Sequence, residues 1–362
     1  AQAAVRAGWR VAALDLFADA DLQAICPTWQ LPMADYPHGF VKLAKQAPPG
    51  PWLYTGGLEN YPEVVAAISK ERELLGNNRD VLLLARDPFE FRHQCFMWAL
   101  PYVSWYYPNE EPTSGTFIRK PRASAGGRGI TLHHQPPYPP AGTTHFWEDY
   151  VPGQPQSAVY LGSRLLGVTE QLIGTDWTGG SGFQYCGSIG PCEVSRRALE
   201  EYGLMGVAML DEFDLRGLFG VDTVLHADGL PYPIELNPRY TASIEILERA
   251  LPIRALPWHL AACRRAERPD FHWNSAMPCT VHGKAILFAR DACRISDRFA
   301  QWCQDQNTNQ PWPLLADLPH PGTLIEPGQP VLTYFTSGGT TDQVRSRLRD
   351  RANELYAHLA SA

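Results

Sequence analysis

The spacing of apolar residues in the first quarter of the chain predicts a small α/β domain. Residues 1–8 have the amphipathic pattern of a short helix that ends at a glycine, and residues 9–17 have the apolar pattern of a buried strand. A helix followed by a strand is half of a parallel α/β repeat. An apolar segment at 51–55 and a helical pattern at 64–75 extend this architecture. We therefore predict a Rossmann-like, doubly wound domain at residues 1–85, whose first strand and glycine-rich turn precede the sequence given.

The rest of the chain divides into two regions. Residues 86–260 carry almost all the glycine-rich loops, and residues 261–362 contain short strand-like runs at 283–289 and 330–335. A helical pattern at 341–359 closes the chain. These patterns predict a mixed α/β (α+β) fold with a strand-rich C-terminal region that ends in a helix.

The composition excludes several classes of protein. Hydrophobic residues make up 44% of the 362 residues and charged residues 19%, which provides apolar material for cores and excludes a disordered, collagen-like or coiled-coil chain. The net charge is -7, and no cluster of Lys and Arg is dense enough to follow a nucleic-acid backbone. No apolar run approaches the roughly 20 residues that cross a bilayer. We expect a cytoplasmic protein with neither nucleic acid nor a membrane as partner.

A glycine-rich loop after a strand is the first candidate binding element. Residues 116–120 alternate like a strand and end at Lys120, and the loop that follows contains Gly126, Gly127 and Gly129. Glycines let successive backbone N–H groups turn toward a bound anion, and a lysine just upstream adds a full positive charge. A surface hairpin loop, in which the glycines only make the turn, explains the same residues. The chain has no G-x-x-x-x-G-K-[ST] string, so this loop is not a P-loop.

A second candidate is a hairpin within residues 220–239. Two runs of β-branched and apolar residues flank Asp228-Gly229, a dipeptide favoured in two-residue turns. A turn centred there places Asp222 opposite Glu235 on one face. Asn237 lies two residues further along the second strand and points to the same side.

The oxygen-bearing side chains of this hairpin predict a metal site. Two like charges in direct opposition are unfavourable unless a cation lies between them, and carboxylate and amide oxygens suit Mg²⁺. Arg239, which follows at once, is placed to hold a transferring phosphoryl group. The alternative is an edge hairpin with solvated acids, and Pro231 and Pro233 favour it because they weaken the ladder and can shift the register.

Together these segments resemble the ATP-grasp superfamily of ATP-dependent carboxylate–amine ligases. The resemblance spans about residues 86–248 and is strongest at three places: Lys120 with its glycine loop, the run EDYVPG at 148–153, and Asp222 with ELNPR at 235–239. It implies an ATP-grasp fold in which residues 86–260 form the ATP-grasp domain, with a lid at about 113–150. Residues 1–85 then form the pre-ATP-grasp domain.

The resemblance also assigns roles to residues. It implies ATP with Mg²⁺, or Mn²⁺ in its place, as cofactor, with Lys120 and the glycine loop over the phosphates. Glu148 is expected at the adenine amino group, and the backbone of Asp149 and Val151 at the adenine edge. The implied metal ligands are Asp222, Glu235 and Asn237, and the implied catalytic residues are Lys120 and Arg239.

The chain departs from the family at one position. The family usually has a further lysine before the lid, whereas residues 84–88 offer only Arg86. An arginine can also bind a phosphate, through two parallel hydrogen bonds. We therefore include Arg86 among the expected nucleotide-binding residues.

A narrower resemblance suggests a substrate class. Residues 3–22, 182–191, 237–243 and 320–323 are similar to a bacterial ATP-grasp subgroup associated with one-carbon carriers of the tetrahydromethanopterin and methanofuran type. It implies an ADP-forming carbon–nitrogen ligase that joins a small carboxylate and an amine through an acyl phosphate. Glutamate is a candidate substrate, and a homodimer is common among such relatives.

Two other functions remain open from the sequence. The strand-rich tail after Lys284 also suits a carboxylase-like ATP-grasp enzyme that activates bicarbonate. A non-catalytic module that senses ATP is the third interpretation.

Overall fold

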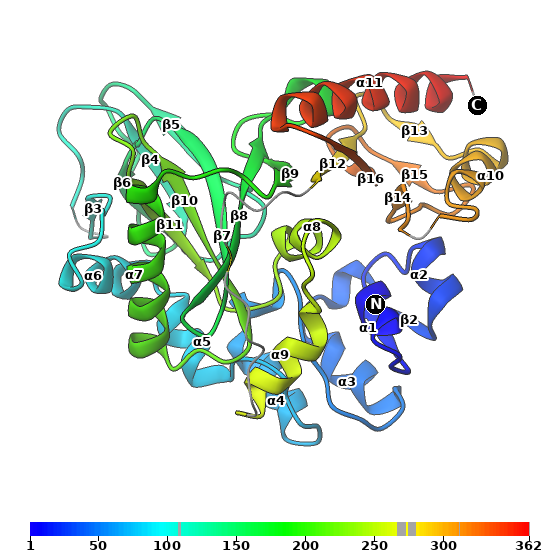
Figure 1. The fold of residues 1–362 in the computed structure, drawn as a ribbon, viewed down its shortest axis with the longest axis horizontal. Helices are drawn as coiled ribbons and strands as arrows, with labels where there is room; N and C mark the ends of the chain where they lie inside the picture. The colour runs from blue at the N-terminus through cyan, green and yellow to red at the C-terminus, as the bar shows by residue number, and fades with distance from the viewer. Residues whose placement is uncertain (108–109, 266–272, 274–279, 311, 362) are drawn as a thin grey trace.

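The computed structural model describes residues 1–107, 110–265, 273, 280–310 and 312–361. The chain forms an N-terminal region of helices, a large curved sheet and a smaller sheet (Figure 1). The observed class is the predicted mixed α/β fold. Among the described residues, no helix is long and apolar enough to cross a membrane.

The N-terminal region is mostly helical around one short parallel strand pair. The strands β1 and β2 pair in parallel, as an α/β repeat requires. The buried strand predicted over 9–17 is wrong in length and burial: β1 has three half-buried residues, which pair with the three residues of β2. The helix predicted over 64–75 ends at Ser69, since Leu74 forms a parallel bridge with Trp52 instead. The elements are α1 Gln2–Arg6, β1 Ala13–Asp15, α2 Ala20–Ile25, β2 Thr28–Gln30, η1 Met33–Asp35, α3 Gly39–Gln46, η2 Leu58–Asn60, α4 Pro62–Ser69, α5 Arg79–Ala85 and α6 Pro88–Met97.

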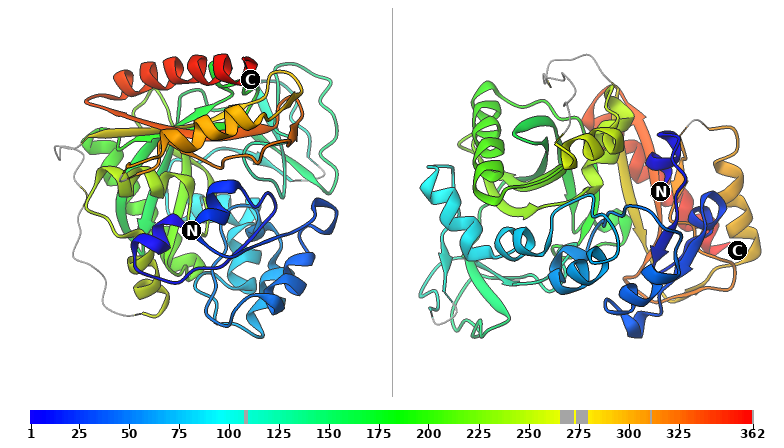
Figure 2. Two further views of the ribbon diagram at one scale, coloured as in Figure 1. Left: turned by 90° about the vertical axis from the view of Figure 1, so that its right-hand side faces the viewer. Right: turned by 90° about the horizontal axis from the view of Figure 1, so that it is seen from below.

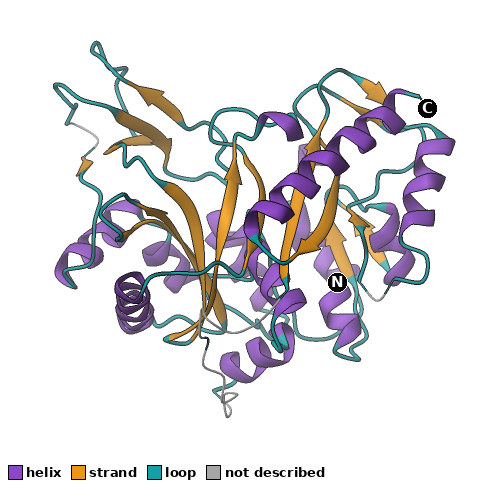
Figure 3. Cartoon of the chain, turned by 45° about the horizontal axis from the view of Figure 1, so that its top comes forward, coloured by secondary structure: helices purple, strands orange, loops and turns teal. Residues whose placement is uncertain are grey.

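An eight-stranded antiparallel sheet runs through the middle of the molecule (Figure 3). Its order is β11-β10-β7-β8-β9-β12-β16-β14, so strands from both sides of residue 260 share one sheet. Residues 185–190 form the interior strand β9 and are mostly buried. The strands are β7 Gln154–Leu161, β8 Arg164–Ile173, β9 Tyr185–Gly190, β10 Leu218–Leu225, β11 Pro231–Asn237, β12 Val281–Phe288, β14 Leu315–Ala316 and β16 Pro330–Gly338.

Helices cover the sheet with apolar faces. The last helix, α11, buries Val344, Leu348, Ala352 and Leu355 at spacings of three and four residues, which makes one continuous stripe. The strand runs predicted at 283–289 and 330–335, and the terminal helix, are confirmed as β12, β16 and α11. The remaining elements are η3 Asp176–Thr178, α7 Arg196–Phe213, α8 Ala242–Ala250, α9 Ala255–Cys263, β13 Cys293–Arg294, α10 Asp297–Gln306, β15 Leu324–Ile325 and α11 Thr341–Ala360.

The N-terminal and C-terminal regions lie against each other (Figure 2). The carboxylate of Asp21 on α2 accepts a hydrogen bond from the backbone N–H of Leu318 at 2.8 Å. The ring of His320 contacts the carbonyl of Ala18 at 2.9 Å. Residues near the two ends of the sequence are therefore in direct contact.

A separate four-stranded sheet stands beside the large one. Its order is β3-β6-β4-β5, and it has its own small core around Phe117, Tyr138 and Trp147. Strand β4 carries Lys120 and strand β6 carries Glu148 and Asp149, so this sheet contributes three of the predicted site residues to the cavity. The strands are β3 Trp105–Tyr106, β4 Phe117–Pro121, β5 Thr131–His133 and β6 His145–Asp149.

Candidate active site

A cavity of about 830 Å³ lies between the two sheets. This volume is typical of sites for small molecules, which span roughly 300 to 1,000 Å³. The small sheet, the glycine loop, the hairpin of the large sheet and the start of α8 all contribute to its wall. Of the predicted site residues, only Gly129 is outside the lining. The lining ones are Arg86, Lys120, Gly126, Gly127, Glu148, Asp149, Val151, Asp222, Glu235, Asn237 and Arg239.

The hairpin β10–β11 has the predicted register at the site. Asp222 is paired with Glu235, and Asn237 is paired with Gly220, two residues along each strand. Residues directly opposite each other in an antiparallel pair share a face, as do residues two apart. The two acids and the amide therefore project from one face of the sheet, into the cavity.

The turn of this hairpin differs from the predicted one. The backbone N–H of His226 bonds to the carbonyl of Leu230 at 3.0 Å, so the reversal is longer than two residues. A bulge after Asp222 leaves Ile234 unpaired and restores the register at the acids. Two prolines in β11 lack the N–H groups of a regular ladder, which accounts for the irregularity.

Asp222 is held by hydrogen bonds from neighbouring side chains. Its Oδ2 accepts from Asn237 Nδ2 at 2.9 Å, and its Oδ1 accepts from Gln171 Nε2 at 3.0 Å. Burial, and next to it the charge of Glu235, raise the pKa of Asp222 to about 6. A divalent cation would relieve this repulsion, so the donor set fits Mg²⁺ or Mn²⁺.

The set is small for a metal centre built from protein alone. In the described parts of the chain, no group of three or more His, Cys, Asp or Glu side chains is placed to hold a metal ion. The hairpin offers two carboxylates and an amide, whose Oδ1 accepts from Arg239 Nη2 at 3.1 Å. Mg²⁺ keeps several waters and is usually bound by one or two carboxylates together with substrate phosphates. The site therefore suits a metal that arrives with a nucleotide.

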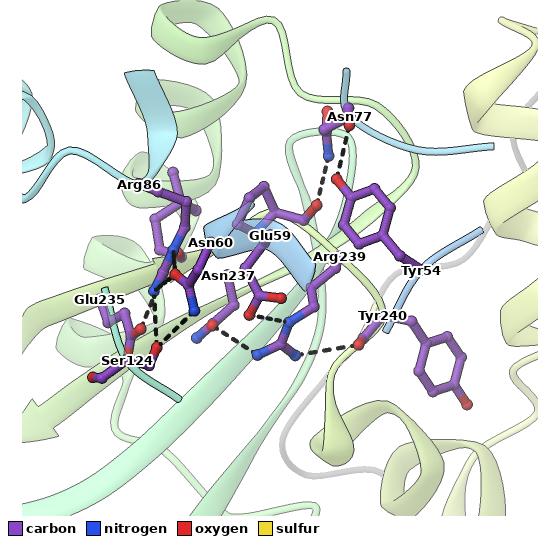
Figure 4. A network of polar contacts seen from close by, with 12 residues as sticks. Tyr54, Glu59, Asn60, Asn77, Arg86, Ser124, Glu235, Asn237, Arg239 and Tyr240 are labelled. Atoms are coloured by element: carbon purple, nitrogen blue, oxygen red, sulfur yellow. Dashed lines mark hydrogen bonds and ion pairs between the residues drawn. The ribbon is translucent and has the colours of Figure 1, made fainter. Parts of the chain in front are cut away.

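Arg86 contacts the predicted metal ligand Glu235. Its Nη1 donates to Glu235 Oε1 at 2.8 Å and to the carbonyl of Leu236 at 2.9 Å. Burial alone would raise the pKa of Glu235, but the Arg86 guanidinium holds it below its usual range. Arg86 also donates to Asn60 Oδ1 at 3.2 and 3.0 Å (Figure 4). Its assignment to a phosphate stays a prediction.

Lys120 on β4 and Glu148 on β6 are diagonal neighbours, two positions apart in the ladder, and form an ion pair. Glu148 is 1% exposed, and its second oxygen forms an ion pair with Arg92 of α6. Burial would raise the pKa of Glu148, but Arg92 and then Lys120 hold it below its usual value. Sequence reasoning missed Arg92, because no pattern around it points to a site.

The glycine loop is packed against the segment that precedes β9. All three loop glycines have positive φ, at 65°, 76° and 77° for Gly126, Gly127 and Gly129. A side chain on Gly127 would put its Cβ 1.8 Å from the carbonyl oxygen of Phe183, so only glycine allows this approach. The carbonyl of Gly126 accepts from the N–H of Tyr185 at 3.1 Å.

Arg239 joins the hairpin to the N-terminal region (Figure 4). Its Nε donates to Glu59 Oε1 at 2.6 Å, and its Nη1 donates to the carbonyl of Tyr240 at 3.3 Å. Glu59 is fully buried and comes from η2. The neighbouring Asn60 donates through Nδ2 to the carbonyl of Ser124 in the glycine loop, at 3.0 Å. Neither Glu59 nor Asn60 was predicted, since these contacts join distant parts of the sequence.

The start of helix α8 forms the last part of the wall. Thr241 is the N-cap residue, its side chain makes no capping bond, and its Oγ1 is buried without a hydrogen-bond partner. Thr241, Ala242 and Ser243 all line the cavity beside Arg239. The N-terminus of a helix favours negative charge. This end of the cavity is therefore suited to an anion.

Comparisons with known proteins agree with this geometry. Residues 99–243 match the family described as "ATP-grasp domain". No curated protein matches the whole sequence at a significant level. The chain therefore contains an ATP-grasp domain.

Solved structures show the same architecture over almost the whole chain. The biotin carboxylase domain of Hydrogenobacter thermophilus 2-oxoglutarate carboxylase is 14% identical, with a TM-score of 0.74 over 96% of this chain and 85% of that one. L-amino acid ligase from Bacillus licheniformis is 15% identical, with a TM-score of 0.70 over 98% and 93%. The PurK N5-carboxyaminoimidazole ribonucleotide synthetase is 15% identical, with a TM-score of 0.68 over 99% and 93%. The fold is that of ATP-grasp enzymes, as the motifs predicted.

Proposed function

We propose that this protein is an ADP-forming ligase that uses ATP to join a small carboxylate to an amine. One observation carries the proposal. The cavity brings Lys120 and the glycine loop, from one sheet, opposite the hairpin acids and Arg239 of the other sheet. Cationic groups and a candidate metal site on facing walls are what phosphoryl transfer requires, because its catalysis is mainly positioning and charge stabilisation.

The nucleotide would lie with its adenine toward β6 and its phosphates toward the hairpin. Asp149 and Val151 line the cavity together with Glu148. The acids Asp222 and Glu235, with Asn237, would hold Mg²⁺ or Mn²⁺. A divalent ion bound there supplies charge neutralisation for the phosphate oxygens.

The acceptor carboxylate fits the start of α8. Arg239 and the unpartnered Thr241 Oγ1 line the same end of the cavity, next to the hairpin acids. There a carboxylate oxygen attacks the terminal phosphorus of ATP, the bond from that phosphorus to the bridging oxygen breaks, and ADP leaves. The amine nitrogen then attacks the acyl carbon, loses a proton and displaces phosphate. Arg239 stabilises the charge on the transferred group.

The wider role rests on resemblance. Similarity to the one-carbon cofactor subgroup supports a cytoplasmic enzyme of tetrahydromethanopterin or methanofuran biosynthesis, with glutamate as a candidate substrate. A homodimer fits the same relatives, and one of the similar structures is itself described as a dimer.

A bicarbonate-activating enzyme is the second candidate. The observation in its favour is the likeness to biotin carboxylase domains, which covers 96% of this chain and includes its strand-rich C-terminal region. A module that binds ATP without turnover is the third. The three functions differ in what makes ADP appear.

The test is an ADP-release screen against mixtures of carboxylates and amines, with mass spectrometry of the products. A ligase releases ADP only when both an acid and an amine are present, and an amide of their combined mass minus water appears. ADP release that depends on bicarbonate would favour the second candidate. Binding of ATP without any ADP release would favour the sensing module. The variant Glu235→Gln keeps the shape of the site and should lose turnover in the first two cases.

A further inference from the structure

Arg92 is a buried cation in the wall of the cavity that none of the predicted roles uses. Its side chain is 2% exposed and comes from α6. One guanidinium nitrogen serves both the Glu148 carboxylate and the carbonyl of Ile234, which it approaches to 3.0 Å. Its Nε is buried and has no hydrogen-bond partner. Together with Glu148 and Lys120 it forms a group that we call the cavity triad.

The charges of this group bear on nucleotide binding. A lysine paired with a buried glutamate is electrically neutral, and a neutral pair attracts a triphosphate weakly. Glu148 holds Lys120 in such a pair. Arg92 supplies a second positive charge to the same carboxylate, so the cavity triad carries a net charge of about +1 in a region shielded from water.

The wall of the cavity as a whole, with the triad included, has no surplus of positive charge. The lining contains as many acidic as basic side chains: Arg86, Arg92, Lys120, Arg122 and Arg239 against Asp87, Glu148, Asp149, Asp222 and Glu235. Loss of one buried cation would leave the wall net negative. A nucleotide that carries several negative charges would then be repelled.

We propose that Arg92 is a positioning residue of the nucleotide site, which neutralises Glu148 so that Lys120 keeps its full charge for the phosphates. This inference rests on the proposed ATP site and deepens it. Arg92 itself lies behind Glu148, packed near the rings of Phe91 and Phe146 at 5.6 Å each. It acts through Lys120 and needs no contact with the nucleotide.

The experiment compares binding of ADP, in the presence of Mg²⁺, with binding of adenosine by calorimetry. The ratio of the two dissociation constants isolates the contribution of the phosphates. In Arg92→Met the triad is neutral, and we expect ADP to lose roughly tenfold or more in affinity relative to adenosine. In Arg92→Met with Glu148→Gln the net charge is +1 again, and the ratio should return to within about twofold of the wild type. Arg92→Lys should behave like the double variant.

A purely structural role predicts a different result. If Arg92 only supports the fold, ADP and adenosine lose affinity equally in Arg92→Met, and the second substitution brings no recovery. Either finding would overturn the proposal. If Arg92→Met does not fold, the double variant is compared with Glu148→Gln alone, whose triad has a net charge of +2. The double variant should then lose about tenfold in its affinity for ADP relative to adenosine. A wild-type protein that binds neither ligand would instead contradict the proposed function.

Discussion

The described residues include two Arg–Glu–Lys groups of similar construction, although the glutamate side chain is 2% exposed in one and 24% in the other. In each, one glutamate forms ion pairs with a lysine and an arginine, and the arginine has a buried Nε without a partner. The lysine side chains are 12% and 11% exposed and the arginine side chains 2% and 4%. One is the cavity triad. The other, which we call the helix triad, consists of Arg249, Glu245 and Lys284.

The two groups differ in what lies next to them. The cavity triad lines the 830 Å³ cavity, whereas no member of the helix triad does. Arg249 is covered by rings instead, with its guanidinium 3.6 Å from the centre of Phe335 and 4.9 Å from that of Trp312. Burial raises the pKa of the nearby Asp317, which also interacts with the charges of Lys284 and Glu245. We therefore expect the two groups to serve different purposes, because only the cavity triad lines the cavity.

The comparison is tested most strongly by removing the lysine from each group. Lys120→Met should lower kcat/KM for ADP release by about a hundredfold or more, because a cation aimed at the transferring phosphates is lost. Lys284→Met should leave kcat/KM within about threefold of the wild type and act mainly on stability. Steady-state ADP release and thermal melting of both variants measure this. Similar losses of activity in the two variants would remove the distinction.

Removing the arginine of the helix triad should affect folding alone. In Arg249→Met the glutamate keeps only Lys284, and the stacking on Phe335 is lost, so we expect the free energy of unfolding to fall by about 2 kcal/mol. Urea denaturation checks the value, and calorimetry should show an unchanged ratio of adenosine to ADP affinity. A change in that ratio would mean that the helix triad also acts on the nucleotide.

The glycine loop lies at the cavity that the cavity triad lines, and the helix triad has no such neighbour. Gly127→Ala places a Cβ against the Phe183 carbonyl, so the loop cannot dock and KM for ATP should rise about tenfold. Gly126→Ala is the matched control, since its Cβ meets nothing within 4 Å and the positive φ is similarly strained. Kinetics of both variants separate lost docking from backbone strain. Equal KM values would contradict a loop that closes over the phosphates.

The carboxylates of the two regions should differ in their response to pH. Glu245 is partly buried, which would raise its pKa, yet Lys284 and Arg249 hold that pKa below its usual value, whereas the pKa of Asp222 is raised to about 6. Because the folded protein binds the Asp222 proton more tightly than the unfolded chain, this group favours folding at low pH, and that advantage is lost as the pH rises through about 6. Without metal, Asp222→Asn should therefore be more stable than the wild type at pH 7.5, by about 1 kcal/mol.

Two measurements check this expectation. Urea denaturation at pH 5 and pH 7.5 should show the advantage of Asp222→Asn at the higher pH and a smaller difference at the lower one. In the presence of ADP, Mn²⁺ binding by the wild type should weaken below about pH 6, as Asp222 takes up a proton. Affinity for Mn²⁺ that is independent of pH between 5 and 8 would exclude Asp222 as a ligand.

The sequence alone predicts the features of this site that lie within one strand or hairpin, but not the contacts between residues far apart in the chain. The alternation of side chains predicts the strand at Lys120, and a turn centred on Asp228-Gly229 predicts the pairing of Asp222 with Glu235. The longer turn and the bulge at Ile234 were not predicted. Each shifts the register by one residue in opposite directions, so together they leave the pairing of the acids unchanged. Arg92 reaches Glu148 from 56 positions away, and Glu59 reaches Arg239 from 180. Such contacts depend on the packing of whole elements, which periodicity does not encode.

The account depends on one claim, that the hairpin acids gather a metal beside a nucleotide in this cavity. Electron paramagnetic resonance of Mn²⁺ with ADP tests it directly, in the wild type, in Glu235→Gln and in Lys284→Met. The wild type and Lys284→Met should bind Mn²⁺ only together with ADP, and Glu235→Gln should bind much less. A Glu235→Gln variant that binds Mn²⁺ and ADP like the wild type would contradict the account.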